Sequence, residues 1–316
     1  MKILWLYQYS SYYNYDKWFH LELVRWMKNN GIGISAYGPN LEIEYKDIVD
    51  MIYDPQADWE AVVKATKSDV AIFNTKSRMF ANYHPIKKVA EGEWLPKGWS
   101  SSKLIPKIMI EEDYHYETDD LWYKTSGFSV VLQRHYSQSL RGKNVKMLWH
   151  PFSVDTSIFK SDNRPRTNKI CFAGSSTTPY PERNLVCYVL QETGLLDAFK
   201  NQEKRGDNYI DCLKTYTAHV SGSSIYDITA AKNFEIAAAG SVLFTNRFSG
   251  LDLIFNKDSY VEYTTQADNI RAQARKIINE PEFVKKTVES AMKDINERHT
   301  NKIRTEELIK LIKENS

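Results

Sequence analysis

Short apolar runs alternate with amphipathic segments along most of the chain. The runs at residues 2–7, 32–37 and 69–74 are mostly apolar and bounded by polar or turn residues, which predicts buried strands. Between them, apolar side chains recur at helical spacing at residues 18–27 and 58–66. This alternation of strand and helix is typical of parallel, doubly wound α/β sheets.

The same alternation starts again in the second half of the chain. The charged stretch KSDNRPRTNK at residues 160–169 has the composition of a linker. A new apolar strand at residues 169–173 then runs into Gly174 and Ser175, at the strand end where such sheets bind ligands. The sequence therefore predicts two Rossmann-like, doubly wound α/β domains facing each other across a cleft.

Composition narrows the classes of partner and compartment. Lys and Arg number 42 against 40 Asp and Glu, so the net charge of +2 gives no general attraction to nucleic acid. The cysteines, Cys171, Cys187 and Cys212, are too few and too far apart in sequence for a zinc site or a disulfide framework. No apolar run is long enough for a signal-peptide core or a membrane span. We expect a soluble, cytoplasmic protein.

The segment SSIYDITAAKNFEIAAAGSVLFTN at residues 223–246 carries the most chemical information. Asp227 and Glu235 are eight positions apart, and a helix beginning near Ile228 would place Lys232 on the face of Glu235. The small residues Thr229, Ala230 and Ala231 would let a phosphate approach the first N–H groups of that helix. The alternative is that Asp227 is an N-cap and Glu235 a solvated helix residue.

A second group of candidates lies in the first half of the chain. Asp113 and His115 follow a predicted strand at residues 104–110 and could contact a transferred sugar or accept a proton. The same residues could instead hold a divalent cation or belong to a solvated loop. The tyrosine-rich residues 7–15 follow the first strand and suit an acceptor platform. His20 and His150 are interpreted as structural.

Four motifs, in order, resemble one family. KNFEIAAAGSVLFTN resembles the R-x-F-E-I-x-A-x-G-x-x-L-x-T segment of GT-B glycosyltransferases, specifically the spore-maturation-protein-like group of the glycosyl transferases group 1 superfamily. MLWHPFSVDTSIFK is similar to the family's interdomain segment, and ICFAGSSTTPYPERNLV to the opening of its second domain. ERHTNKIRTEELIKLI is similar to its closing helix. The resemblance covers about residues 145–312 and is only architectural over residues 1–140.

The resemblance implies a GT-B fold. Residues 1–152 would form an acceptor-side domain, residues 153–298 a nucleotide-sugar-binding domain, and residues 299–316 a helix packing back on the first domain. In the family, the position of Glu235 holds the ribose hydroxyls, and the position of Asp227 lies near the donor sugar. Lys232 replaces the usual Arg and keeps the charge without its bidentate geometry.

The resemblance also implies a metal-independent enzyme, in which cations and helix dipoles stabilise the leaving diphosphate. Lys232 and Arg183 are the candidate cations, although Arg183 could simply pair with Glu182. The predicted catalytic residues are Asp113, His115, Asp227 and Lys232. The predicted donor-binding residues are Gly174, Ser175, Arg183, Thr229, Ala230, Ala231, Lys232 and Glu235. No metal ligand and no cofactor besides the donor substrate are predicted.

These features together predict a retaining, hexosyltransferase-type glycosyltransferase. The donor would be a nucleotide-diphosphate sugar, with UDP-sugar favoured and GDP- or TDP-sugar as alternatives. The acceptor would be a carbohydrate or small molecule. Three alternatives stay open: a phage-type enzyme that glycosylates hypermodified DNA bases, a sugar-nucleotide-binding module without turnover, and a nucleotide-sugar epimerase.

Overall fold

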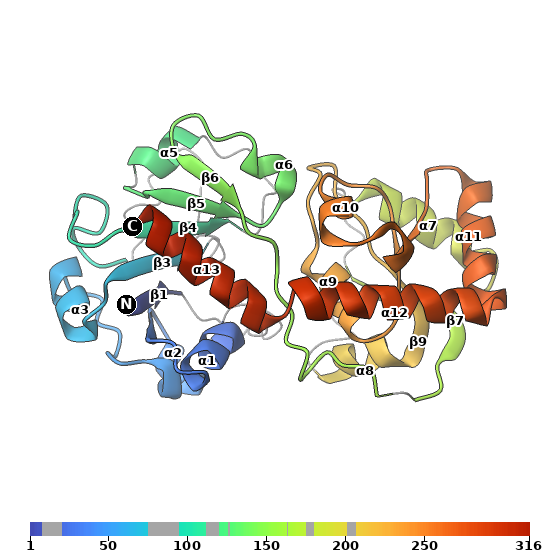
Figure 1. The fold of residues 1–316 in the computed structure, drawn as a ribbon, viewed down its shortest axis with the longest axis horizontal. Helices are drawn as coiled ribbons and strands as arrows, with labels where there is room; N and C mark the ends of the chain where they lie inside the picture. Colours follow the sequence, from blue (N-terminus) through green and yellow to red (C-terminus); the bar gives the residue numbers. More distant parts are fainter. Residues whose placement is uncertain are drawn as a thin grey trace. The chain divides into compact units, whose positions relative to one another are not determined.

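A computed structural model describes residues 1–7, 21–74, 95–111, 120–125, 127–162, 164–174, 180–200 and 207–316. The chain divides into two compact units, each built on a parallel sheet (Figure 1). The first unit comprises Met1–Arg134, Gln138–His150 and Thr305–Ser316. The second comprises His135–Ser137 and Pro151–Arg304.

The first unit contains a six-stranded sheet in the order β2-β1-β3-β4-β5-β6, with every neighbouring pair parallel. Its strands are β1 (Ile3–Leu6), β2 (Ile34–Tyr37), β3 (Val70–Asn74), β4 (Lys107–Glu111), β5 (Val130–Gln133) and β6 (Lys146–Trp149). Its helices are α1 (Leu21–Asn29), α2 (Leu41–Glu44), α3 (Trp59–Thr66) and α5 (Asp120–Thr125). The short η2 (Lys46–Ile48) follows α2.

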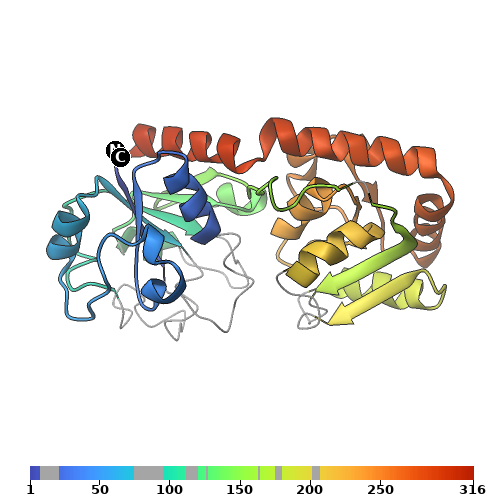
Figure 2. The ribbon, with the colours of Figure 1, turned by 90° about the horizontal axis from the view of Figure 1, so that it is seen from below.

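Helices cover both faces of this sheet, which explains why its central strands are buried at every position and mostly apolar. On one face, Ile3 and Trp5 pack in one cluster with residues of α1 and with Leu308 and Ile312. The last two belong to α13 (Asn301–Asn315), which lies on the same side of the sheet as α1 (Figure 2). On the other face, Trp59 from α3 joins a second buried cluster.

The second unit contains a five-stranded parallel sheet in the order β11-β10-β9-β7-β8. Its strands are β7 (Thr167–Gly174), β8 (Leu196–Lys200), β9 (Tyr216–Val220), β10 (Val242–Thr245) and β11 (Val261–Glu262). Its helices are α7 (Pro181–Gln191), α8 (Asp207–Thr215), α9 (Ala231–Ala238), α10 (Leu251–Ile254), α11 (Ala267–Asn279) and α12 (Pro281–Arg298). The short α6 (Tyr136–Ser139) spans the boundary between the units, and η4 (Lys257–Ser259) precedes β11.

The predicted fold class is confirmed, since both sheets are parallel and interleaved with helices. Two local predictions are wrong, and one strand was not predicted. The charged segment at residues 160–169 is not all linker, because β7 begins at Thr167 and Arg166 donates to the carbonyls of Leu213 and Tyr216. The helix expected to begin near Ile228 begins at Ala231. β8 was not predicted, because its sequence LDAFK has too few apolar residues.

Within the described ranges, no helix combines the length and the apolar character needed to cross a membrane.

Candidate functional site

The carboxyl ends of three neighbouring strands lie together at one edge of the second sheet. β7 ends at Gly174, β9 at Val220 and β10 at Thr245, and all three run in the same direction. Loops at this edge of a parallel sheet form the usual ligand site of a doubly wound fold. The loop of residues 221–230, which joins β9 to α9, carries most of the predicted site residues.

Side chains from three elements fix the start of this loop. The guanidinium of Arg183, on α7, donates from Nε to the carbonyl of Gly222 at 3.2 Å and stacks on the Tyr180 ring, 3.7 Å from its centroid. Asn246 Oδ1 accepts from the backbone N–H of Ser223 at 2.8 Å. A Cβ on Gly222 would lie 2.5 Å from Asn246 Oδ1, so a larger residue here would displace the amide that holds the loop. Arg183 therefore holds the loop. Among the described contacts, it forms no ion pair with Glu182, its alternative partner.

The first turn of α9 follows at the end of the loop. Ala230 is the N-cap, and no described side chain caps the helix. Ala230 and Ala231 are half-buried, and Asn233 already donates its backbone N–H to Ala230 O at 3.0 Å. The preceding Thr229 donates its own N–H to Nδ1 of His135 at 3.1 Å. An uncapped helix N-terminus with small side chains can accept an anion from the side of the strand ends.

Lys232 reaches from α9 to the end of β7. Its ammonium donates to the carbonyl of Ala173, and a Cβ on Gly174 would lie 2.6 Å from its Nζ. Burial and the positive charge of Arg183 lower the pKa of Lys232 to about 8, although the charge of Glu235 raises it. Burial also lowers the pKa of Arg183. The half-buried Lys232 and the buried Arg183 thus lie close enough to interact, and Glu235 partly offsets the charge of Lys232.

Glu235 is itself buried, with 3% of its surface exposed. Its Oε2 accepts from the hydroxyl of Tyr209, on α8, at 2.6 Å. Burial raises the pKa of Glu235 to about 7, although the Tyr209 hydrogen bond and the charge of Lys232 both lower it. The alternative of a solvated helix residue is therefore wrong.

Buried polar atoms without a partner gather on this segment. Among the described residues, Thr229 Oγ1, Asn233 Nδ2 and Glu235 Oε1 are buried and make no hydrogen bond. Buried polar atoms are nearly always hydrogen-bonded in folded proteins, and each exception costs about 1–3 kcal/mol. Three exceptions within seven residues indicate a site that a polar ligand completes.

Asp227 does not cap α9, so its interpretation as an N-cap is wrong. Its backbone has a φ of 56°, in the left-handed region that Asp tolerates better than most residues. Its Oδ1 accepts from the backbone N–H of Ser249 at 2.8 Å, and its carbonyl accepts from the Ser137 hydroxyl at 3.1 Å. Asp227 therefore ties the loop before α9 to the loop after β10.

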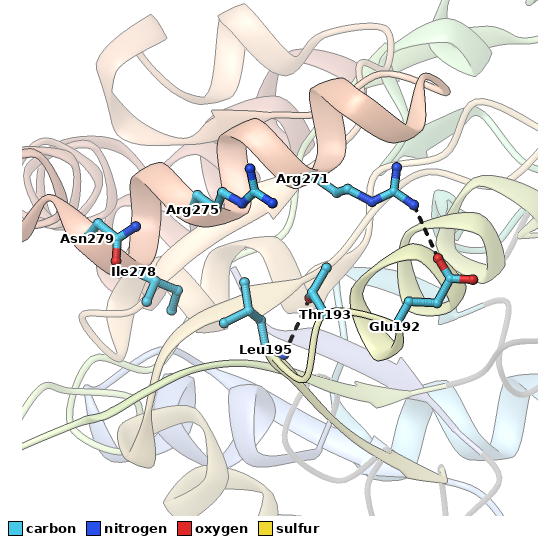
Figure 3. Close-up of a pocket in the computed structure, with 7 residues that line it drawn as sticks. All are labelled: Glu192, Thr193, Leu195, Arg271, Arg275, Ile278 and Asn279. Atoms are coloured by element: carbon cyan, nitrogen blue, oxygen red, sulfur yellow. Dashed lines mark hydrogen bonds and ion pairs between the residues drawn. The ribbon is translucent and has the colours of Figure 1, made fainter.

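A cavity of about 620 Å³ lies beside Asp227, between Tyr136, Arg247 and the residues that lead into α10. A second cavity, of about 580 Å³, lies between α11 and the loop after α7 (Figure 3). In it, Arg271 donates to Glu192 at 3.2 Å. Leu195 at its floor precedes β8, so this cavity lies at the amino ends of the strands, away from Gly174. The cavity beside Asp227 is the one near the candidate site.

Several predicted residues lie outside the described ranges. These are Ser175, Asp113 and His115, together with residues 8–15 of the tyrosine-rich segment and His20. His150 is described: it is buried, and its Nδ1 lies 2.7 Å from Nη1 of Arg134. Tyr209, Asn233, Gly222 and Asn246 were not among the predicted residues. No local pattern marks them, because each acts through a partner distant in sequence or through an unpaired atom.

The second half of the chain matches a family model of known proteins. Residues 172–310 match a family model described as "Glycosyl transferase-like". No curated protein is significantly similar to the chain in sequence.

Solved structures resemble the chain over almost its whole length. A glycosyltransferase from Rickettsia africae has a TM-score of 0.70 at 11% identity, covering 99% of this chain and 98% of that one. HepE from Anabaena, in complex with UDP and glucose, has a TM-score of 0.70 at 11% identity, with 99% of each chain covered. An α-glucosyltransferase in complex with UDP-glucose and DNA containing an abasic site has a TM-score of 0.62 at 10% identity, with 99% of each chain covered.

These likenesses show the fold, which is the GT-B fold of glycosyltransferases. The family match lies in the second unit and the helix that follows it, and it includes the loop before α9 and α9 itself. The chain thus carries a glycosyl transferase-like domain with the fold that the sequence predicts.

Proposed function

We propose that this protein is a retaining glycosyltransferase that takes a hexose from a UDP-sugar and transfers it to a carbohydrate or small-molecule acceptor. The observation that supports this most strongly is the pairing of Lys232 with the uncapped N-terminus of α9 inside the region matched to glycosyltransferases. The finer assignment to the spore-maturation-protein-like group, and the other predicted site residues, are part of the same proposal.

The diphosphate of the donor would bind between the end of β7 and the first turn of α9. The backbone N–H groups at Ala231 and Lys232 would donate to its oxygens, and the helix dipole would favour its charge. Burial and the charge of Arg183 lower the pKa of Lys232, and burial lowers the pKa of Arg183, so a bound dianion would stabilise the charged form of both groups. Arg183 would act through the loop that it holds at Gly222, and Lys232 through direct contact.

The ribose of the donor would bind at Glu235. Its Oε1 is a buried acceptor without a partner in the described structure, and two ribose hydroxyls are donors of the right kind. Tyr209 would keep the carboxylate oriented through its 2.6 Å hydrogen bond to Oε2. Asn233 Nδ2 and Thr229 Oγ1 are further unpaired groups that a nucleotide could satisfy.

The sugar would extend toward Asp227 and the cavity beside it. Cleavage of the sugar–phosphate bond leaves negative charge on the nucleoside diphosphate while the sugar becomes oxocarbenium-like. Lys232 and the α9 dipole would stabilise that developing charge, so a divalent cation is not needed. Asp113 and His115 remain the candidates for contacts to the transferred sugar or to the acceptor's proton.

One observation favours a second candidate acceptor. A neighbour with the same fold was solved with UDP-glucose and DNA, so a base in DNA is a possible acceptor for this fold. The net charge of +2 favours a carbohydrate or small molecule instead.

The test is a donor panel with the full chain. Thermal unfolding is measured with UDP-, GDP- and TDP-glucose and with the free diphosphates, and donor consumption is followed with and without Mg²⁺ or Mn²⁺. We expect UDP and UDP-glucose to stabilise the protein, by about 2.7 kcal/mol at one hundred times the dissociation constant. Lys232→Met is the variant compared with wild type in the same measurements. The proposal is refuted if no sugar nucleotide stabilises the wild-type protein. The anomeric configuration of the product, read by NMR, tests retention.

A further inference from the structure

Two of the three cysteines meet a histidine against one face of the second sheet. Cys171 on β7 and His219 on β9 are register partners in the parallel ladder, so their side chains leave the sheet on the same face. Cys212 on α8 packs against that face, and its Sγ lies 3.4 Å from Sγ of Cys171. The expectation that the cysteines are too far apart for a shared site is therefore wrong for this pair, which is separated by 41 residues in sequence.

The three side chains form a compact set of donor atoms. Both Sγ atoms and a ring nitrogen of His219 all lie within 4.8 Å of one another. The exposed fractions are 0% for Cys171, 3% for Cys212 and 1% for His219. Nε2 of His219 is buried and has no hydrogen-bond partner among the described residues. A buried imidazole nitrogen without a partner is unfavourable, and a metal ion is one partner that such a nitrogen takes.

We propose that Cys171, Cys212 and His219 bind a borderline or soft metal cation, with Zn²⁺ as the first candidate. Two sulfurs and one imidazole nitrogen are a donor set that Zn²⁺ prefers. Tetrahedral coordination at Zn–S distances of about 2.3 Å requires sulfurs about 3.8 Å apart. The observed 3.4 Å is near that separation and well beyond the roughly 2.05 Å of a disulfide bond.

The ligation step balances in protons and charge, because a thiol that binds the metal gives up its proton. Binding of one Zn²⁺ would form two Zn–S bonds and one Zn–N bond and release two protons to solvent. The two thiolates would cancel the charge of the cation, which suits a buried site.

Cys187 provides a matched control within the same domain. It lies on α7, is half-buried, and packs against the opposite cluster of the sheet core. Cys187→Ser removes a thiol from the same unit and leaves the proposed ligands intact.

The experiment measures metal bound to the full chain. Purified wild-type protein is dialysed against trace Zn²⁺, analysed for metal content, and titrated with Co²⁺ after metal removal. We expect about one Zn²⁺ per chain and a thiolate-to-cobalt charge-transfer band for wild type and Cys187→Ser. Cys171→Ser, Cys212→Ser and His219→Gln should lose the band and bind Zn²⁺ at least tenfold more weakly.

Two outcomes would overturn the proposal. One is a wild-type protein that retains no stoichiometric Zn²⁺ and shows no charge-transfer band. The other is a peptide mass two hydrogens lower before reduction, which would identify a Cys171–Cys212 disulfide in place of a metal. If a cysteine variant fails to fold, the wild-type measurements and His219→Gln decide the question.

Discussion

Replacing Glu235 with glutamine should stabilise the protein and weaken nucleotide binding at the same time. In the ligand-free protein, burial raises the pKa of Glu235 from 4.5 to about 7. The pKa of this carboxyl is thus higher in the folded than in the unfolded protein. Its contribution to the free energy of unfolding is greatest below the pKa of the unfolded state and is lost as the pH rises through the pKa of the folded state. Above pH 7 the buried charge costs about 3 kcal/mol, from 1.36 kcal/mol per pKa unit.

Glutamine cannot ionise, so it removes this cost, which begins above the unfolded pKa of 4.5 and is complete above the folded pKa of about 7. Relative to wild type, Glu235→Gln should gain about 2–3 kcal/mol between pH 5 and pH 8, a shift of about 5–10 °C in the melting temperature of a domain of this size. The hydrogen bond from Tyr209 to Oε2 can survive as a bond to the amide oxygen, so part of the orientation is retained. Calorimetry at pH 5 and pH 8 measures the difference.

Nucleotide binding should change in the opposite direction. Ribose hydroxyls bind the ionised carboxylate of Glu235 more strongly than the protonated form. Wild-type affinity for UDP should therefore rise as the pH increases from 6 to 8, and binding of UDP should release a proton from Glu235. Glu235→Gln should lose about 1–3 kcal/mol, or about 5–150-fold in affinity, and its pH dependence. Isothermal titration at three pH values is the assay.

Exposed Glu289, on α12, supplies the control for both measurements, and Glu289→Gln should leave stability and affinity unchanged. A Glu235→Gln protein that melts lower than wild type at both pH values and binds UDP with unchanged affinity would refute the reasoning. Glu235 would then be a structural partner of Tyr209 and not a ligand of the ribose.

Three further predictions concern Lys232 together with Gly174, the role of Asp227, and binding to DNA. Lys232→Met should weaken UDP binding about 10–100-fold. Gly174→Ala should also weaken UDP binding, because the added Cβ displaces the Lys232 ammonium. The two effects should therefore be strongly non-additive in a double-mutant cycle. Asp227→Ala should lower stability by about 1–2 kcal/mol, because Ser249 loses its acceptor and alanine is unfavourable in the left-handed backbone conformation. Asp227→Asn should retain the wild-type stability. A loss of turnover in Asp227→Asn without a loss of stability would show that the charge of Asp227 takes part in the reaction. Filter binding of duplex DNA should be weak at low salt, and tight, salt-sensitive retention would instead favour a DNA acceptor.

The alternating pattern was sufficient to predict the architecture. Strands buried on both faces have continuous apolar sequences, and those at residues 2–7 and 69–74 correspond to β1 and β3. β8 was missed, because the charged Asp197 and Lys200 interrupt its apolar pattern. Asp197 is accommodated in the strand by partners, since Lys169 and Tyr216 both donate to its carboxylate. Side-chain pairing of this kind is not visible in a hydrophobic pattern.

The limits of the sequence are clearest where contacts are distant along the chain. Glu235 and Lys232 share a helix, so their proximity was predictable from spacing alone. Tyr209 reaches Glu235 from another helix, 26 residues upstream, and no local pattern indicates it. The two sulfurs of Cys171 and Cys212 likewise meet only because β7 and α8 pack together.

The charge of the candidate site is the property that sequence composition conceals most completely. The whole chain is nearly neutral at +2, yet the half-buried Lys232 lies near the buried Arg183, and the pKa of both groups is lowered. The carboxylate placed to offset them, Glu235, has its own pKa raised to about 7 and is only partly ionised at neutral pH. The buried groups therefore carry more positive than negative charge, beside a helix N-terminus that adds to the same sign. Such an excess of positive charge lowers the stability of the fold, and an anion that binds there removes the excess. The energetics of the ligand-free protein and the chemistry of a diphosphate donor therefore indicate the same strand ends.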